Sequence, residues 1–347
     1  MFGRKERRTI PYGMFDHASY GLAAKNARVL ERVYHKAHAQ AWDGKEVLAA
    51  LVELHGTPTL EPHVKEALGR VFSIILWGEL AAWRISAELA DEIEPIEGKL
   101  AATSQAFDEA RHFYVMHDYL ELLGVQPNAI HWGARRLLER VMNADNLAKK
   151  LLGMQLMVEP IALTLFHVVK SMNLEPVLSA LLPYYERDES RHVALGIQYL
   201  PAMMARMSRA ERLELFAFQG ELLTYEVVTN TLLMRDLQQL GVHPRTLIDV
   251  GKTKQLKAME MVLGTLDLKI EWPLVFLDHY AEALVELTIP APEMGVVERL
   301  TRVARAARYG TVGETPDVAL VPDIADRDTP LVHSVRGQRR ESLAEAA

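Results

Sequence analysis

The sequence contains no cysteine, so the chain has no disulfide, no iron–sulfur cluster and no thiolate nucleophile. Any bound metal must therefore be held by oxygen and nitrogen donors. The basic stretch at residues 1–13 lacks the apolar run of a signal peptide, and the apolar runs elsewhere are judged too short to cross a bilayer. We therefore expect a cytoplasmic protein without a membrane span.

An excess of positive charge is also missing. Asp and Glu outnumber Lys and Arg by 46 to 39, which gives a formal net charge of −7. A mildly acidic chain has no general attraction for nucleic acid, and we expect no such partner. The basic clusters Arg4–Arg8 and Arg336–Arg340 are short and terminal, and we interpret them as solvated ends. With 49% apolar residues in 347, the chain has room for a large core.

Alternating β-branched patterns are rare, and helical periodicity dominates from about Leu22 to Arg308. We predict an all-α fold with one helical domain over residues 1–309, in which a bundle at about 65–205 is followed by extra helices at about 206–309. Residues 310–347 lose the helical period, and we interpret them as an irregular tail, with a docking segment as the alternative. Breaks between helices are predicted where Gly, Pro and Asn cluster, at Gly56–Pro62, Ile93–Gly98, Gly124–Gly133, Met172–Pro176, Gly241–Pro244 and Ile289–Gly295.

The pattern Asp-Glu-x-Arg-His occurs twice, at residues 108–112 and 188–192. Residues three apart lie on one face of a helix, so Glu109 with His112, and Glu189 with His192, can each offer a carboxylate and an imidazole to a metal. One copy is easily an accident of a charged helix surface, but two copies of all five positions are not. The repeat therefore predicts a site for two metal ions.

Two further carboxylates, Glu79 and Glu159, stand alone among mainly apolar neighbours on their helix faces. Glu79 precedes Glu109 by 30 residues, and Glu159 precedes Glu189 by 30 residues. The midpoint of each interval falls in a predicted turn, so each lone Glu faces its Glu-x-x-His partner across an antiparallel hairpin. Pro160 removes a backbone hydrogen bond inside the helix and should kink it or favour a π-bulge.

Charge balance supports a metal at this position. Four carboxylates in one bundle core would repel each other and take up protons, whereas two divalent cations balance them. Carboxylate oxygens and imidazole nitrogens without sulfur favour iron or manganese, with zinc as the alternative on affinity grounds.

This arrangement resembles the ferritin-like dinuclear carboxylate proteins, in which two helices supply a Glu and two supply Glu-x-x-His. The resemblance covers about residues 65–200, and it implies a four-helix bundle that carries a dinuclear metal site. Residues 188–196, DESRHVALG, are most similar to the hydroxylase α subunits of bacterial multicomponent monooxygenases, which act on methane, toluene or phenol. The wider family includes the small subunits of ribonucleotide reductase. The ligands implied by the resemblance are Glu79, Glu109, His112, Glu159, Glu189 and His192.

The same resemblance implies a supporting network behind the ligands. Asp108 and Asp188 would each accept a hydrogen bond from the metal-bound His of the opposite motif, and Arg111 and Arg191 would complete the network. Such bonds fix the tautomer and the orientation of an imidazole ligand.

Four positions depart from the patterns of particular relatives. Met116 stands where ribonucleotide reductase small subunits commonly have the radical Tyr. Ala82 and Met154 stand where the ligand-binding oxidases have a Val–Tyr crosslink, which therefore cannot form here. Leu163 replaces a Thr of the monooxygenases. None of these four positions is a predicted metal ligand, so the departures leave the predicted metal site unchanged. They do weaken the match to each particular reaction.

A reduced di-iron centre can bind and activate O2 beside a dry, apolar pocket. The leading hypothesis is an O2-activating non-haem di-iron oxygenase or oxidase, of monooxygenase type, that acts on a small apolar or aromatic substrate. The predicted cofactors are two iron ions, with a manganese–iron pair as the alternative, and O2 is the predicted co-substrate. Alternative functions are a radical protein like the ribonucleotide reductase small subunit, a ligand-binding oxidase, and an iron-storage ferroxidase.

The sequence also suggests partners and a pocket. No flavin, nicotinamide or iron–sulfur signature is visible, so a separate reductase or ferredoxin is implied as electron donor, and we expect a homodimer. Tyr185 and three other tyrosines are interpreted as packing residues, with a redox role as the alternative. We expect the substrate pocket to be lined by residues for which core packing is the alternative: Trp83, Phe113, Met116, Leu163, Phe166 and Val193.

Overall fold

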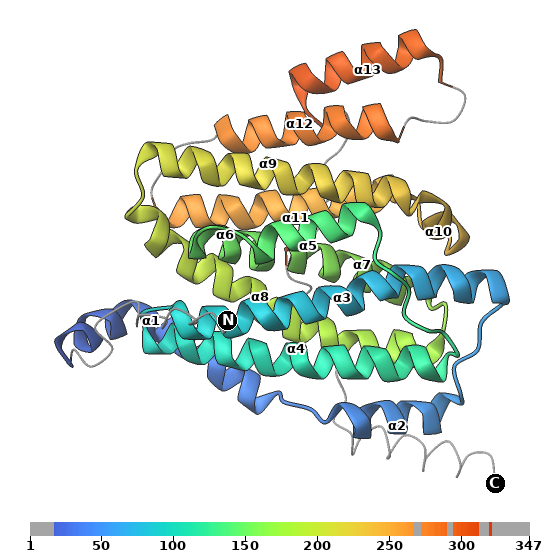
Figure 1. Ribbon diagram of the computed structural model, residues 1–347, viewed down its shortest axis with the longest axis horizontal. Coiled ribbons are helices and arrows are strands. Elements are labelled where there is room, and N and C mark those ends of the chain that lie inside the picture. The colour runs from blue at the N-terminus through green and yellow to red at the C-terminus, as the bar shows by residue number, and fades with distance from the viewer. Residues whose placement is uncertain (1–16, 267–271, 290–293, 312–318, 321–347) are drawn as a thin grey trace, which may run out of the picture.

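A computed structural model gives the fold and describes residues 17–266, 272–289, 294–311 and 319–320, with the backbone alone for residues 17–27. The described residues form helices and no strand (Figure 1). Both basic terminal clusters, and residues 310–347 except for 310, 311, 319 and 320, lie outside this description. In chain order the elements are α1 (His17–Ala39), α2 (Gly44–His55), α3 (Pro62–Glu92), α4 (Ile96–Leu122), α5 (Trp132–Met142), α6 (Leu147–Leu151), the π-helix η1 (Leu152–Val158), α7 (Glu159–Met172), α8 (Pro176–Ala205), α9 (Arg209–Leu232), α10 (Met234–Gln239), α11 (Pro244–Thr265), α12 (Trp272–Thr288) and α13 (Val296–Tyr309).

The bundle consists of α3, α4, the continuous segment α6–η1–α7, and α8. Helix α3 packs along α4, and α7 packs along α8, as two antiparallel hairpins (Figure 1). Their turns occupy residues 93–95 and 173–175, where the sequence predicts them. The predicted all-α bundle with additional flanking helices is therefore confirmed.

Five of the six predicted breaks coincide with ends of consecutive helices, and of the sixth, Ile289–Gly295, the residues 290–293 lie outside the described residues. Further breaks occur where a polar side chain caps the next helix and no Gly or Pro cluster marks the sequence. Asp43 accepts from the backbone N–H of Glu46 at 2.9 Å, and Asn146 accepts from Lys149 at 2.9 Å. Ser208 begins α9 with a capping box. A single capping residue is a weaker sequence signal than a Gly–Pro cluster, which is why these ends escaped prediction.

The helix that carries Glu159 is distorted where the sequence predicts it. Residues 152–158 form a π-helix, which ends immediately before Glu159 and Pro160. The backbone N–H of Glu159 bonds to the carbonyl of Met154, five residues earlier. Pro160 has no N–H to continue a regular α-helical ladder, so the wider turn places Glu159 at the junction of two helical registers.

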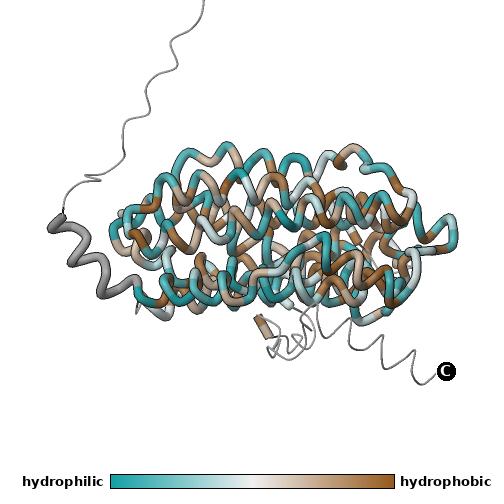
Figure 2. Tube along the Cα trace, turned by 90° about the horizontal axis from the view of Figure 1, so that it is seen from below, coloured by the Kyte–Doolittle hydropathy of each residue, from teal (hydrophilic) through white to brown (hydrophobic). Residues whose placement is uncertain are grey.

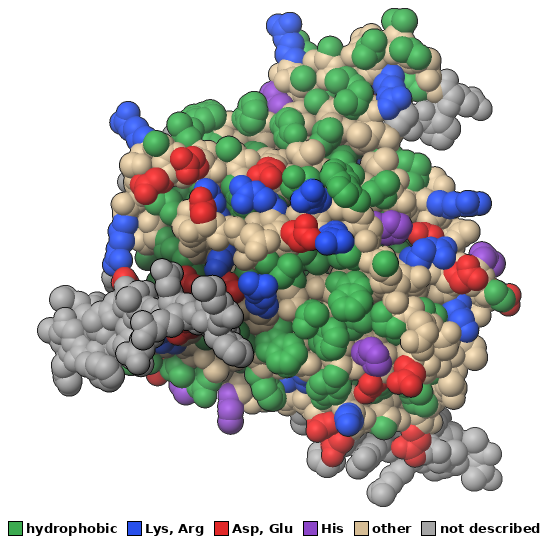
Figure 3. All heavy atoms as spheres, viewed as in Figure 1, with side chains coloured by type: hydrophobic (Ala, Val, Ile, Leu, Met, Phe, Trp, Pro, Cys, Tyr) green, Lys and Arg blue, Asp and Glu red, His purple; other side chains and the backbone are tan. Residues whose placement is uncertain are grey.

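Flanking helices enlarge the core on both sides of the bundle. Helices α9 and α11 pack against the η1–α7 segment, α12 packs on α9, and α1 and α2 cover α4 and α8 (Figure 1). Along the coloured part of the chain trace, apolar positions alternate with polar ones (Figure 2). Apolar side chains also remain exposed on α12 and α13, at the top of Figure 3; Val296 and Val297 are 75% and 79% exposed.

The expectation that every apolar run is too short to cross a bilayer is wrong. The segment Leu147–Met172 is long and apolar enough to cross a bilayer by length and composition. However, 72% of its apolar window is buried inside the bundle, and it carries the buried Glu159. Its apolar character is explained by packing on every side, as expected for a central helix of a large core.

The apolar core is divided into two large clusters, and the predicted metal ligands lie between them. On α3, Leu76 belongs to one cluster and Ala82 to the other, with Glu79 in between. On α8, Tyr185 and Val193 belong to different clusters and bracket Glu189. The bundle therefore has a polar layer enclosed by apolar layers above and below.

Candidate metal centre

The bundle brings the six predicted ligands together from four helical segments. Two ligands come from single positions, Glu79 on α3 and Glu159 at the start of α7. The other four come in pairs, from α4 and α8: Glu109 with His112, and Glu189 with His192. Every one of these side chains is buried. They form two overlapping groups, in each of which the donor atoms lie within 4.8 Å of one another: Glu79, Glu109, His112 and Glu189 in one, and Glu109, Glu159, Glu189 and His192 in the other.

The two groups have matching geometry. His112 Nδ1 lies 3.4 Å from a Glu79 oxygen and 3.1 Å from a Glu189 oxygen. His192 Nδ1 lies 3.8 Å from a Glu159 oxygen and 3.0 Å from a Glu109 oxygen. Each imidazole thus faces one lone Glu and the Glu of the opposite motif. Glu109 and Glu189 belong to both groups, which is the arrangement that two neighbouring cations with shared carboxylates require.

The unsatisfied atoms of the cluster indicate what would complete it. Glu109 Oε2, Glu189 Oε1 and His112 Nδ1 are buried, and His112 Nδ1 lies 3.6 and 3.1 Å from the two oxygens, respectively, but none of the three makes an aligned hydrogen bond in the described part of the chain. Buried polar atoms are rarely left unpaired, because each one costs the free energy of its lost hydration. These three atoms converge on the middle of the cluster, so a cation there would satisfy them. The donor set of carboxylate oxygens and imidazole nitrogens fits iron or manganese.

The pKa shifts of the cluster without metal ions also indicate that it is built to hold cations. Burial raises the pKa of Glu79 and of Glu159 well above the usual range, and the other carboxylates nearby add to this effect. Burial also raises the pKa of Glu109, but the neighbouring His192 and His112 outweigh it and leave that pKa below its ordinary value. Without cations, the cluster therefore holds protons to reduce its negative charge.

Behind the cluster, the aspartate of each motif contacts the histidine of the other motif. His112 Nε2 lies 3.2 Å from Asp188 Oδ2, and His192 Nε2 lies 3.4 Å from Asp108 Oδ2. This leaves the Nδ1 atoms for the cluster, since an imidazole that donates from one nitrogen offers the lone pair of the other.

Two arginines complete this network. Arg191 donates to Asp188 at 2.7 Å and to Asp108 at 3.0 Å. Arg111 donates to Asp188 at 2.8 Å and also contacts Asp108. Burial alone would raise the pKa of Asp188, but Arg191, His112 and Arg111 hold it well below the ordinary range. Both aspartates are therefore fixed as hydrogen-bond acceptors for the histidines.

The comparisons with known proteins concern the fold. No protein-family model and no curated protein sequence matches the chain. Among solved structures, the chain is similar to Protein 19 with aldehyde deformylating oxidase activity from Synechococcus, with a TM-score of 0.50 and 18% sequence identity over 71% of this chain and 98% of that one. The fold is ferritin-like. At this level of identity, the similarity concerns the architecture of the ferritin-like bundle and leaves the reaction to be argued from the site.

Several residues of the site in this ferritin-like bundle were missed in the sequence. Gln105 donates to Glu109 at 3.1 Å and to Glu159 at 3.0 Å, and Gln155 donates to Gln105 at 3.1 Å. Each Gln precedes a ligand Glu by four residues, a spacing that could have found them. Trp42 Nε1 donates to Asp188 Oδ2 at 2.7 Å from the loop before α2, and no local pattern predicts a contact over 146 residues.

Tyr185 lies directly against one histidine of the cluster. Its ring is stacked on the His112 ring with the centroids 4.4 Å apart, and its hydroxyl donates to the His112 backbone oxygen at 2.8 Å. Burial raises its pKa well above the ordinary value. The hydroxyl is therefore protonated and satisfied, in agreement with a packing role.

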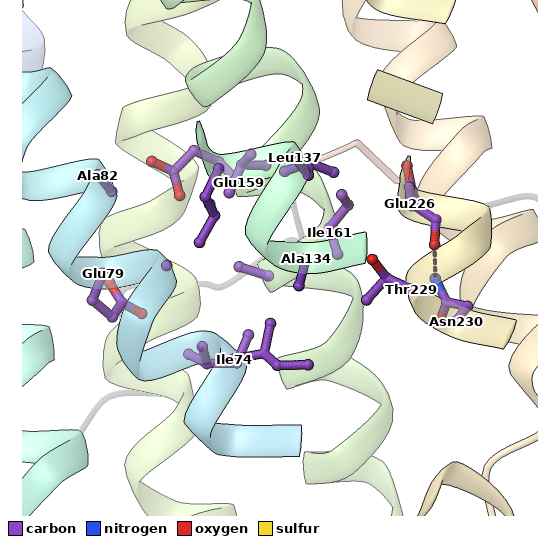
Figure 4. Close-up of a pocket in the computed structure, with 15 residues that line it drawn as sticks. Ile74, Glu79, Ala82, Ala134, Leu137, Glu159, Ile161, Glu226, Thr229 and Asn230 are labelled. Atoms are coloured by element: carbon purple, nitrogen blue, oxygen red, sulfur yellow. Dashed lines mark hydrogen bonds between the residues drawn. The ribbon is translucent and has the colours of Figure 1, made fainter. Parts of the chain in front are cut away.

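A cavity reaches the cluster from the side of the two lone carboxylates. The space between its walls, including open solvent at its mouth, is about 620 Å³, and it is bounded by residues of α3, α5, η1, α7 and α9. Figure 4 shows Glu79 and Glu159 at one side of it and Glu226, Thr229 and Asn230 at the other. Most of the remaining lining is aliphatic, and none of it is aromatic.

The predicted pocket residues do not line this cavity. Trp83 is 41% exposed, and Phe113 is partly buried against the core. The other four are fully buried packing residues: Met116, Leu163, Phe166 and Val193. The alternative interpretation, ordinary core packing, therefore describes those four better. Periodicity indicates that a side chain faces inward, but it does not distinguish tight packing from the edge of a cavity.

Proposed function

We propose that the chain is a non-haem di-iron oxidoreductase that uses O2 to oxidise a small, largely apolar substrate. The observation that carries the proposal is the pair of overlapping ligand groups beside an apolar cavity. Glu109 and Glu189 would be shared by the two metals, and Glu79 with His112, and Glu159 with His192, would complete one metal each. Two irons held in this way supply O2 binding and two-electron redox chemistry. A manganese–iron pair is the alternative.

The protein's own residues have three tasks in this proposal. Asp108 and Asp188 orient the histidines, and Gln105 holds Glu109 and Glu159 by hydrogen bonds. The aliphatic walls exclude water and position an apolar substrate next to Glu79 and Glu159. The structural neighbour that shares the fold is described as having aldehyde deformylating oxidase activity, and for this chain the class of chemistry is argued from its own ligand groups and cavity. Monooxygenation is the form of oxidation that we propose.

The electrons come from outside the chain in this account, because the sequence carries no signature of a flavin or an iron–sulfur cluster. We propose a separate reductase or ferredoxin as the donor, a homodimeric assembly, and a cytoplasmic location.

The test is a single turnover of the full chain. Protein loaded with Fe(II) under anaerobic conditions is mixed with octane and isotopically labelled O2, and the products are analysed by mass spectrometry. We expect octanol carrying the label, and O2 uptake that is lost when Glu109 and Glu189 are both replaced by Ala. Growth of a mineral core far beyond two irons per chain, without any organic product, would instead support the iron-storage alternative.

A further inference from the structure

The cavity contains a second polar group, at the side opposite the metal ligands, that the proposed oxidation does not use. Glu226 on α9 lines this cavity together with Thr229 and Asn230, one turn further along the same helix. A neighbouring apolar cavity shares the same three residues, so Glu226 stands where the two spaces meet. Only 4% of Glu226 is exposed.

Glu226 lacks the compensation that other buried carboxylates have. Its Oε2 accepts from the neutral amide of Gln255 at 2.8 Å, and Gln255 also donates to the backbone oxygen of Met157. Among the described residues outside the metal cluster and its supporting aspartates, the other buried acids contact cations or cap a helix: Glu175, Glu186, Asp236, Glu282 and Glu286. An uncompensated buried carboxylate is costly and points to a partner that is not part of the chain.

The groups that line the cavity beside Glu226 offer hydrogen-bond acceptors to a ligand. The Thr229 hydroxyl donates its proton to the backbone oxygen of Tyr225 at 2.7 Å, which leaves its lone pairs. The Asn230 amide donates one N–H to the backbone oxygen of Glu226 at 3.0 Å, which leaves its carbonyl oxygen as an acceptor and its second N–H as a donor (Figure 4). No Lys, Arg or His lines the cavity. An anionic carboxylate with two further acceptors is complementary to a cation that donates several hydrogen bonds.

The space for such a group is the cavity that Glu226 lines. On its other side the carboxylate packs closely against α11 at Gly251, where a Cβ would lie 3.1 Å from Glu226 Oε1. Burial raises the pKa of Glu226 to about 7, against which the Gln255 hydrogen bond works, and a bound cation would favour the ionised form. Between Glu226 and the ligands Glu79 and Glu159, the cavity wall is aliphatic.

We propose that Glu226, with Thr229 and Asn230, binds the protonated amino group of an aliphatic amine, whose hydrocarbon chain extends along the cavity towards Glu79 and Glu159. This inference rests on the proposed function, because it names the substrate class of that same site. The amino group is the anchor, and the carbon atoms nearest the lone carboxylates are those presented for oxidation.

Binding of octylamine and octanol to the full chain, as purified with its metals and kept anaerobic at pH 8, tests this assignment by calorimetry. We expect the wild-type protein to bind octylamine more tightly than octanol. Glu226→Gln should weaken octylamine binding by on the order of ten-fold or more, since a hydrogen bond to a charged group is lost, and should leave octanol binding unchanged. The matched control is Glu214→Gln, an exposed position on the same helix, where no change is expected.

A second pair of variants guards against misfolding of the buried substitution. Thr229→Val and Thr231→Val remove equivalent hydroxyls that each donate to the carbonyl four residues earlier, but only Thr229 lines the cavity. Octylamine binding should weaken in the first variant and not in the second. Absent octylamine binding in the wild type, equal affinity for octanol, or unchanged affinity in both Glu226→Gln and Thr229→Val would overturn the assignment.

Metal content measured on the same samples distinguishes a failure of the amine site at Glu226 from a failure of the proposed oxidation. Two metals per chain without amine selectivity would refute the role of Glu226 and leave the proposed oxidation standing. Amine binding that depends on Glu226 in a chain that takes up no metal would refute the proposed oxidation and leave the amine site standing.

Discussion

His112 and Asp188 lie 76 residues apart in the sequence, and in the structure His112 Nε2 is 3.2 Å from Asp188 Oδ2. The aspartate of the second motif therefore orients the histidine of the first, and Asp108 does the same for His192 at 3.4 Å. The two repeats are thus halves of a single site, each incomplete without the other.

Replacing Asp188 by Asn tests this crosswise support. The amide cannot serve as an anionic acceptor for His112 and for two arginines at once, so the imidazole should lose its fixed orientation. We expect metal affinity to fall by roughly 10- to 100-fold, as is usual when a partner behind a metal ligand is changed. Competition with a chelator measures the affinity. Asp145→Asn, at an exposed position, is the control, and an identical affinity in both variants would mean that Asp188 does not support the ligands.

Metal binding should release protons. In the bare cluster, burial raises the pKa values of Glu79 and Glu159. Burial lowers the pKa values of His112 and His192, but the surrounding carboxylates outweigh it and raise them well above the ordinary range. All four groups therefore hold their protons to higher pH than the free side chains do, and they must deprotonate before they can serve as ligands. Apparent metal affinity should therefore rise as the pH is raised. Calorimetry in buffers of different ionisation enthalpy counts the protons; a count of zero would contradict the assigned ligands.

The titration of Glu226 should make the stability of the folded chain depend on pH. Its pKa is raised by burial from 4.5 to about 7, so the folded chain holds this proton more tightly than the unfolded chain does. Stability should therefore fall as the pH rises from 4.5 to 7, and remain lower above that. The cost at high pH is on the order of 3 kcal/mol.

Glu226→Gln removes this titration. Relative to wild type, the variant should gain stability between pH 5 and pH 8, measured by chemical unfolding, because the amide carries no charge to bury. In Glu214→Gln, where the carboxylate is exposed, the difference from wild type should not change over that range. A parallel pH dependence in wild type and Glu226→Gln would show that Glu226 is not the group that titrates.

The bundle and its ligands could be predicted because the information is local and repeated. The equal spacing of Glu79 from Glu109, and of Glu159 from Glu189, fixes the two hairpins once their turns are known. Pro160 likewise marks the distorted helix, since its missing N–H acts on its own turn.

The cavity could not be predicted, because its walls come from distant helices. Helices α5 and α9 complete it, and how closely they approach depends on the packing of the whole core. Glu226 did leave a signal: it stands alone on α9 between Leu222, Leu223 and the polar Thr229 and Asn230, much as Glu79 stands alone on α3. Trp42 left none, because its contact with Asp188 joins a loop to a helix far along the chain.

The central claim is that six side chains hold two metal ions, and elemental analysis of the purified chain after anaerobic loading with Fe(II) tests it most directly. The account predicts about two metal ions per wild-type chain, the number for which ferritin-like dinuclear sites are built. It predicts none in the chain with both Glu109→Ala and Glu189→Ala, provided that circular dichroism shows the helices intact. Full metal occupancy in that double variant, or a wild-type chain that binds no metal, would contradict the account.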